Sequence, residues 1–411
     1  MDRTLVCYRC ESEYRDDRRV RCDCGEPLWF DVDSSALEDL AGRGERPTGR
    51  DGRGPWRYAD ALPAADPGGI AAAAGNTPLI RSPRLDRVAG CRVYVADEGE
   101  NPTGSYKDRG SAVAVALALE RGADVVGTVS YGNMAMSTAA HAASLDLECV
   151  VLVPETVSPG RLELIAQYDP TILRVEGDYG GLYREALELT RSLPISFLLS
   201  DDPARVAGYE TALFEIHEAL APETPDAIVV PASSGGLASG IWRGLRDLER
   251  AGAFAEPPRL YVVQTAASDP ITRAFAAGRD DVSPLPADEV GETIARSIGN
   301  PNPPSGTRAL TAVRRTGGAA ISVTDEEIER AQRRFAELGG FCVEPASATT
   351  LAGVERLTER GEIDEDETAV LVPTGTGFKE LGTGAETEAD RAETVARPDL
   401  SSRLESLASR R

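Results

Sequence analysis

Short apolar runs alternate with longer segments of helical character through the middle of the chain. Runs rich in β-branched residues predict buried strands, and the alanine-rich or amphipathic segments between them predict helices. Strands and helices that alternate at this spacing form parallel βαβ units, so the predicted fold class is α/β. The predicted strands are 92–96, 125–129, 149–153, 171–175, 227–230, 260–264 and 369–372. The predicted helices are 111–121, 134–144, 158–168, 181–191, one that begins near Ile241, 270–277, and one that follows Thr324 and runs to Leu338.

One loop of this pattern carries a rare residue. Lys107 is one of only two lysines in the chain, and Lys379 is the other. It follows the turn-forming sequence Asn-Pro-Thr-Gly at 101–104 and precedes an alanine-rich run, which predicts a position in the first turn of a buried helix. A lysine there can have a lowered pKa and act as a nucleophile, whereas an arginine cannot lose its proton. A surface lysine that caps the helix is the alternative.

The decapeptide 101–110, Asn-Pro-Thr-Gly-Ser-Tyr-Lys-Asp-Arg-Gly, resembles the cofactor-lysine motif of the threonine synthases. These belong to the tryptophan-synthase-β-like, fold type II group of pyridoxal-phosphate enzymes. The segments 341–348, Phe-Cys-Val-Glu-Pro-Ala-Ser-Ala, and 298–301, Ile-Gly-Asn-Pro, are also similar to that family. The resemblance covers roughly residues 1–382. It implies two three-layer α/β domains with an N-terminal zinc ribbon, and a Lys107 that binds pyridoxal 5'-phosphate covalently.

The resemblance also implies cofactor contacts after other predicted strands. Asn133 matches the asparagine that hydrogen-bonds the phenolic oxygen of the cofactor, and a helix N-cap is its alternative role. Thr374 matches the residue that hydrogen-bonds the pyridine nitrogen, and a plain turn threonine is the alternative. A glycine- and serine-rich turn between a strand and a helix offers backbone N–H groups to a phosphate. The residues of this turn are Ser233, Ser234, Gly235, Gly236 and Leu237.

Substrate contacts are predicted at Ser105, Ser200 and Arg205. Ser200 and Arg205 match the family stretch that holds the phosphate of the substrate. Tyr209 and Glu210, however, stand where the family has glutamine and lysine. Because a like charge near a phosphate weakens binding, Glu210 argues against a phosphorylated substrate. A surface arginine in a salt bridge is the alternative for Arg205.

Three functions remain open at this stage. The first is threonine synthase activity, which converts O-phospho-L-homoserine and water to L-threonine and phosphate, with Lys107 transferring protons. The turn 233–237 reads Ser-Ser-Gly-Gly-Leu, which is more similar to threonine and serine dehydratases. A threonine dehydratase-like or cysteate-synthase-like β-eliminating or β-replacing enzyme is therefore the second. The third is a non-catalytic ligand sensor that keeps the cofactor pocket, and the presence of Lys107 argues against it.

Four of the seven cysteines, Cys7, Cys10, Cys22 and Cys24, lie in the first 24 residues. Four thiolates at this spacing favour a closed, tetrahedral zinc site with a structural role. The second pair is Cys-x-Cys, which departs from the usual ribbon, and reduced metal-free cysteines are the alternative. Many threonine synthases resemble the chain in having such a ribbon.

The charge balance excludes some partners. The chain has 67 acidic and 44 basic residues and a net charge of −23, which repels nucleic acid and anionic membranes. With so few lysines, this is typical of a halophilic protein in a high-salt cytoplasm, and a mesophilic protein with an acidic surface is the alternative. Neither a signal pattern nor a membrane-spanning run occurs, so we expect a cytoplasmic enzyme of a small amino-acid substrate. A homodimer is compatible with the sequence, which does not determine the oligomeric state.

The predicted organisation has four parts. A zinc ribbon occupies 1–33, and a linker rich in glycine, proline and arginine occupies 34–75. The catalytic region, 76–382, consists of two α/β domains, of which the smaller spans roughly 100–205. An acidic tail, 383–411, lacks periodic apolar residues and is expected to be solvated.

Overall fold

In the computed structural model, the described residues are 3–15, 18–32, 54–157, 159–177, 179–254 and 256–380, together with 395, 397 and 402–404. The chain divides into two compact units, Met1–Gly377 and Phe378–Arg411. The first part of the predicted linker 34–75 and most of the predicted tail 383–411 lie outside the described residues. Within the described ranges, no helix combines the length and the apolar character needed to cross a membrane.

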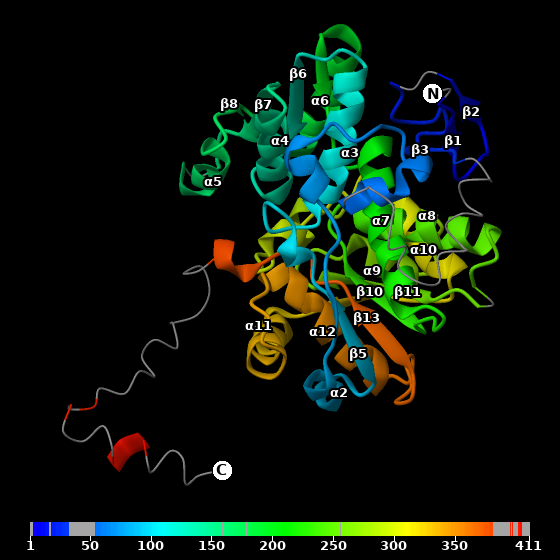
Figure 1. Cartoon of the computed structure of the whole chain (residues 1–411), viewed down its shortest axis with the longest axis vertical. Helices are drawn as coiled ribbons and strands as arrows, with labels where there is room; N and C mark the ends of the chain where they lie inside the picture. Colours follow the sequence, from blue (N-terminus) through cyan, green and yellow to red (C-terminus); the bar gives the residue numbers. More distant parts are fainter. Residues whose placement is uncertain are drawn as a thin grey trace. The chain divides into compact units, whose positions relative to one another are not determined.

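The larger sheet has six strands. Its strands β5, β10, β11 and β13 are labelled in Figure 1. All neighbouring strands run parallel except β4 and β5, which are antiparallel. Every residue of the central strand β10 is buried, as expected for a parallel strand covered on both faces. The strand order is β12 (Ala320–Val323), β11 (Arg259–Thr265), β10 (Ala227–Pro231), β13 (Thr368–Leu371), β5 (Arg92–Ala96) and β4 (Leu79–Arg81).

The smaller sheet has four strands, all parallel to their neighbours. It is the sheet shown in green and teal in Figure 1, with helices α3, α4 and α6 beside it. The strand order is β8 (Thr171–Val175), β7 (Glu148–Pro154), β6 (Val125–Val129) and β9 (Ile195–Phe197), and the helices are α3 (Lys107–Glu120), α4 (Asn133–Ser144), α5 (Glu163–Ala166) and α6 (Tyr179–Ser192).

Helix α7 (Pro203–Leu220) joins the hydrophobic cores of the two sheets. It packs against α3 on one side and against α8 on the other. A Cβ at Gly208 would lie 2.1 Å from the carbonyl oxygen of Arg109, so only glycine fits where α7 crosses α3. The helices beside the larger sheet are α2 (Pro83–Ala89), α8 (Gly236–Arg250), α9 (Pro270–Ala276), α10 (Gly306–Arg315), α11 (Asp325–Arg334) and α12 (Pro345–Glu359).

A third, antiparallel sheet forms the N-terminal ribbon, with the order β2 (Glu13–Tyr14), β1 (Leu5–Cys7) and β3 (Leu28–Phe30). Aromatic rings of the ribbon pack against α8. The ring centres of Tyr8 and Trp29 lie 5.7 Å and 5.4 Å from that of Trp242. From α10, Arg308 donates hydrogen bonds to the carbonyl oxygens of Pro27 and Leu28.

The predicted α/β pattern is confirmed, with corrections at particular elements. The strands 92–96, 125–129 and 171–175 have their predicted bounds, but helix α8 begins at Gly236 and not near Ile241. The predicted helix 158–168 is only a 3₁₀ turn followed by the short α5. The helix after Thr324 ends at Arg334 and continues as a π-helical turn to Gly339. The pattern missed β9, β12, α2, α7, α10 and α12.

Candidate active site

The predicted site residues follow the carboxyl ends of parallel strands in both sheets. Lys107 follows β5, Thr374 follows β13 and the turn 233–237 follows β10, and these three strands are neighbours. In the smaller sheet, Asn133 follows β6 and Ser200 follows its neighbour β9. Ligands in α/β sheets bind beyond these ends, so the topology gathers the predicted residues in the expected region.

Lys107 is the first residue of α3, as predicted. Its amine donates a hydrogen bond to the hydroxyl oxygen of Tyr106 at 2.6 Å and lies 5.6 Å from the ring centre of Tyr209. Burial and the positive charge of Arg205 lower the pKa of Lys107 to about 7, while the Glu344 carboxylate acts in the opposite direction. The amine therefore exists in both protonation states near neutral pH, as a general acid and base requires.

Thr374 is held against the start of α3. Its carbonyl oxygen accepts a hydrogen bond from the backbone N–H of Tyr106 at 3.0 Å. Its hydroxyl lies 3.3 Å from the hydroxyl of Ser347, which also binds the backbone N–H of Gly375 at 2.9 Å. These bonds fix the buried Thr374 side chain, and Ser347 is a supporting residue that the sequence analysis did not assign.

Asn133 connects the two sheets. It is the first residue of α4, whose N-cap is Gly132, so the alternative role of Asn133 as the N-cap is wrong. Its side-chain amide donates to the carboxylate oxygens of Glu344 at 3.0 and 3.3 Å. Glu344 is buried and is the N-cap residue of α12. Glu344 lies in the segment 341–348 that resembles the family, but the resemblance carried no prediction for this carboxylate.

The turn 233–237 has the backbone geometry of an anion site. Gly235 is the N-cap of α8 with φ +85°, and no described side chain caps this helix. A Cβ at Gly235 would lie 2.6 Å from the carbonyl oxygen of Ser305, and one at Gly236 would lie 2.8 Å from that of Ser200. Only glycine fits at these close approaches, and the first N–H groups of α8 are left to bind a negative group.

Three buried hydroxyl groups lie near these N–H groups. Those of Ser105 and Ser200 have no hydrogen-bond partner within the part of the chain that the structure describes, whereas the Arg205 guanidinium acts on that of Tyr209 and offsets part of the rise in its pKa that burial causes. Burial of unpaired polar groups is unfavourable, so native proteins seldom leave them without a partner. Ser105 lies two residues before Lys107 and Ser200 lies against the start of α8, so these hydroxyls are placed to contact a polar ligand beyond the strand ends.

Arg205 and Glu210 lie in unexpected surroundings. Arg205 is fully buried and donates to the hydroxyls of Ser111 at 2.9 Å and Thr138 at 2.6 Å, so its alternative as a surface arginine is wrong. Glu210 is fully buried where α7 meets α8, with its carboxylate 3.0 Å from Nε of Arg243. Burial raises the pKa of Glu210 well above its usual value, and Arg243 offsets only part of this effect. Since the carboxyl is either neutral or paired with Arg243, Glu210 no longer argues against a phosphorylated substrate.

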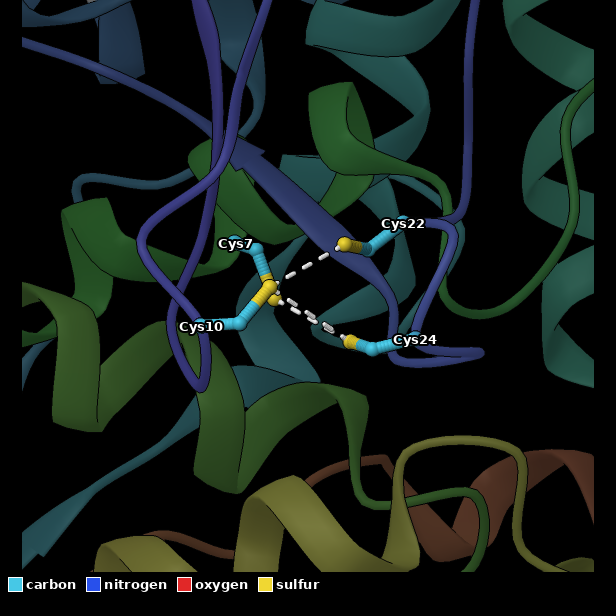
Figure 2. A group of neighbouring side chains, drawn as sticks. All are labelled: Cys7, Cys10, Cys22 and Cys24. Carbon is cyan, nitrogen blue, oxygen red and sulfur yellow. Dashed lines mark hydrogen bonds between the residues drawn. The ribbon is translucent and has the colours of Figure 1, made fainter.

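The four N-terminal cysteines converge (Figure 2). Their sulfur atoms all lie within 4.8 Å of one another, with 3.6 Å between Cys7 and Cys24 and 3.4 Å between Cys10 and Cys22. A tetrahedron with Zn–S bonds of about 2.3 Å places its sulfurs about 3.8 Å apart. The short second pair closes through Gly25, which has φ +92° and donates its N–H to the carbonyl oxygen of Cys22. The cluster therefore has the dimensions of a zinc site.

Comparison with known proteins agrees with this geometry. The family model described as pyridoxal-phosphate dependent enzyme matches residues 70–375. The threonine synthase of Methanocaldococcus jannaschii is 37% identical over 378 residues, which cover 91% of this chain and 92% of that protein. The threonine synthase of Methanosarcina acetivorans is 36% identical over 382 residues, which cover 90% and 91%.

Solved structures share the fold. A threonine deaminase from T.th. has a TM-score of 0.61 and 26% identity, covering 73% of this chain and 92% of that one. Maize serine racemase has a TM-score of 0.64 and 22% identity, covering 86% and 95%, and supports the fold alone. The chain therefore belongs to the pyridoxal-phosphate-dependent enzyme family and has the fold type II architecture.

Proposed function

We propose that this chain is a threonine synthase, which converts O-phospho-L-homoserine and water to L-threonine and phosphate. The observation that carries the proposal is the likeness to two proteins of that name, at 36% and 37% identity over about nine-tenths of each chain. Pyridoxal phosphate is the cofactor of the family, and when bound it supplies an electron sink that acidifies the substrate carbon next to the amino group.

In this proposal, residues at the strand ends hold the cofactor. Lys107 binds it covalently, Thr374 contacts the ring nitrogen and the turn 233–237 binds the phosphate at the uncapped start of α8. Asn133 contacts the ring oxygen. A side-chain amide nitrogen carries two hydrogens, so Asn133 can keep its bond to Glu344 and still donate to the cofactor.

Lys107 then moves protons on the substrate. With a pKa of about 7, lowered chiefly by burial, a free Lys107 amine can take a proton from a carbon atom and later return it. Below that pKa the amine is mostly protonated and cannot act as a base. The rate of a step limited by proton removal should therefore fall as the pH drops through neutrality.

Ser105 and Ser200 are the proposed substrate contacts, and the predicted contact Arg205 is proposed to act through its charge, because all three of its guanidinium nitrogens bind protein groups. The two serine hydroxyls are buried and have no partner among the described residues, so each can donate to a ligand. Arg205 uses its guanidinium to bind Ser111 and Thr138, so its main contribution is positive charge beneath the pocket. That charge favours a phosphate and also helps to keep the Lys107 amine neutral.

A specific observation favours a second candidate, a threonine deaminase-like enzyme. The turn 233–237 is similar to that of the dehydratases, and the T.th. threonine deaminase shares the fold at 26% identity. The purified chain, loaded with cofactor and assayed at high salt, should release phosphate and threonine from phosphohomoserine. Ammonia and 2-oxobutanoate formed from threonine, without phosphate release from phosphohomoserine, would instead establish the deaminase.

For the ribbon, we propose that Cys7, Cys10, Cys22 and Cys24 bind one structural zinc ion. The sulfur separations of 3.4–3.8 Å support this proposal, as does the convergence of all four sulfurs. All four ligand positions would be occupied by protein, which leaves no open position for catalysis.

A further inference from the structure

The surroundings of the free Lys107 amine carry a further inference, which rests on the proposed covalent role of this lysine. A lysine that binds the cofactor is released each time a substrate amine takes its place. Its amine then needs a defined position from which to move protons. In the structure, the Lys107 amine lies against two tyrosine side chains.

Tyr106 provides the closest contact. The Lys107 amine donates to its hydroxyl oxygen at 2.6 Å and lies 4.4 Å from the centre of its ring. Burial raises the pKa of Tyr106 well above its usual value, so the phenol stays neutral while Lys107 titrates. It therefore acts as a hydrogen-bond acceptor without adding a charge of its own.

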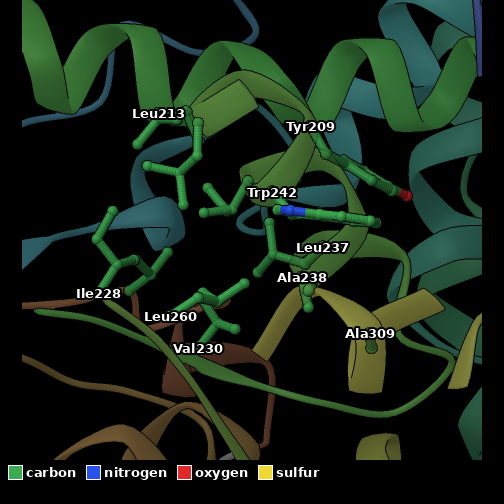
Figure 3. Packing of buried hydrophobic residues seen from close by; sticks show 14 of the residues in the cluster. Tyr209, Leu213, Ile228, Val230, Leu237, Ala238, Trp242, Leu260 and Ala309 are labelled. Atoms are coloured by element: carbon green, nitrogen blue, oxygen red, sulfur yellow. The ribbon is translucent and has the colours of Figure 1, made fainter. Parts of the chain in front are cut away.

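Tyr209 supports Tyr106 from α7. The two rings lie 4.9 Å apart, and that of Tyr209 is also 5.6 Å from the Lys107 nitrogen. In Figure 3, the Tyr209 hydroxyl points away from the aliphatic side chains of the neighbouring core. A Cβ at Gly110 would lie 2.5 Å from the Tyr209 ring, so this glycine makes room for it, and Gly240 lets α8 approach the backbone of α7 at Tyr209.

We propose that Tyr106 and Tyr209 hold the Lys107 amine whenever it is not bonded to the cofactor, with the Tyr106 hydroxyl as its hydrogen-bond acceptor. The two tyrosines are positioning residues, because they act through the lysine. The charged groups that also act on the amine are Arg205 of α7 and Glu344 at the start of α12. Arg205 favours the neutral amine, and Glu344 favours the ammonium form. The Tyr106 hydroxyl and the two rings also favour the ammonium form, so the tyrosines act in the same direction as Glu344.

The scarcity of lysine makes a direct test practical. Full-length protein labelled with ¹³C-lysine and free of cofactor should give only two lysine signals in NMR spectra, and Lys379→Arg assigns them. The Lys107 signal of the wild type should titrate near neutral pH. Tyr106→Phe keeps the ring but removes the acceptor, which disfavours the ammonium form. The midpoint of the Lys107 titration in this variant should therefore lie about one pH unit lower than in the wild type.

Activity of the cofactor-loaded enzyme provides the second readout. In Tyr106→Phe, kcat on phosphohomoserine should fall about tenfold, with little change in KM, and the acidic limb of its pH profile should move to lower pH. Tyr209→Leu should shift the midpoint less and in the same direction, with thermal unfolding as a check on its fold. The matched control is Tyr261→Phe, which removes a hydroxyl that donates to the Glu362 carbonyl oxygen at 2.9 Å. This control should change neither the Lys107 midpoint nor the activity.

Two outcomes separate this proposal from the proposed function. Equal Lys107 midpoints in wild type and Tyr106→Phe would overturn the role of the tyrosines, whatever reaction the enzyme catalyses. A wild-type protein that gains no absorption band at about 410 nm with pyridoxal phosphate would overturn the proposal that Lys107 binds the cofactor covalently. In that case the NMR titration would still report whether Tyr106 holds the amine.

Discussion

The cysteine cluster and the candidate active site around Lys107 are assembled in opposite ways. The four cysteines of the cluster lie within the first 24 residues, and short turns bring their sulfurs together. The candidate active site takes Lys107, Ser200 and Thr374 from strand ends that are far apart in sequence. Local spacing is therefore enough to recognise the first site, whereas the second exists only once both sheets have formed.

The two regions are nevertheless joined by polar contacts. Arg21, next to Cys22, pairs with the fully buried Asp201, which follows Ser200. The ribbon also binds Arg308, whose guanidinium lies 3.2 Å from the Ser305 hydroxyl. Ser305 in turn donates its backbone N–H to the carbonyl oxygen of Ser234 at 2.8 Å. The following changes test how far the two regions depend on each other.

Lys107→Ala should produce the largest difference between the two regions, because it should affect the active site and leave the cysteine cluster unchanged. Activity should fall by more than about a thousandfold, because the cofactor attachment and the proton carrier are lost together. Zinc content and thermal stability should stay close to those of the wild type. Activity assays, absorption spectra and metal analysis of the same preparation provide the measurement. Lys107→Arg should not rescue activity, since arginine keeps its proton, and a rescue would contradict the proposed role.

Substitution of a zinc-binding cysteine should instead change metal content and stability. Cys22→Ser should lose zinc and lower the melting temperature by several degrees, because metal binding contributes directly to folding. Cys342 lies outside the cluster, so Cys342→Ser is the matched control and should keep zinc. Less than about half an equivalent of zinc in the wild type would reject the metal site.

A smaller effect is expected from Thr374→Val, which keeps the shape of the side chain and removes its hydroxyl. If that hydroxyl contacts the ring nitrogen, kcat should fall about tenfold without a change in zinc content. Thr374→Ser keeps a hydroxyl and should retain most activity. Equal rates for the valine and serine variants would show that the hydroxyl has no role.

The smallest expected effect tests the connection itself. Arg21→Ala leaves Asp201 unpaired beside Ser200, so KM for phosphohomoserine should rise a few-fold with little change in kcat. Arg21→Lys keeps the charge and should lie between the alanine variant and the wild type. An unchanged KM in Arg21→Ala would mean that the ribbon and the candidate active site are functionally independent.

Sequence patterns predicted the apolar, β-branched strands and the alanine-rich helices α3 and α4, although both helices are buried along most of their length. They failed for α7, where every residue from Pro203 to Glu218 is buried and charged residues interrupt the apolar ones, so that neither a helical period nor an alanine-rich run marks the helix. They also missed β9, which has only three residues. The position of Lys107 at the start of α3 was predictable from the preceding turn.

The contacts between site residues were not predictable in the same way. Tyr209 lies on the unpredicted α7, so its approach to Lys107 depends on how that helix packs. The bond between Asn133 and Glu344 joins residues whose separation in sequence hides their proximity. Glu210 was misinterpreted because sequence position alone does not show its partner, Arg243.

The close packing around Tyr209 has a consequence for how this protein can evolve. Gly110 and the tyrosine ring occupy a shared volume, in which a methyl group on the glycine would overlap the aromatic ring. Substitutions at these two positions are therefore expected to be strongly epistatic. A relative that carries alanine at position 110 could acquire the tyrosine only after, or together with, a change to glycine.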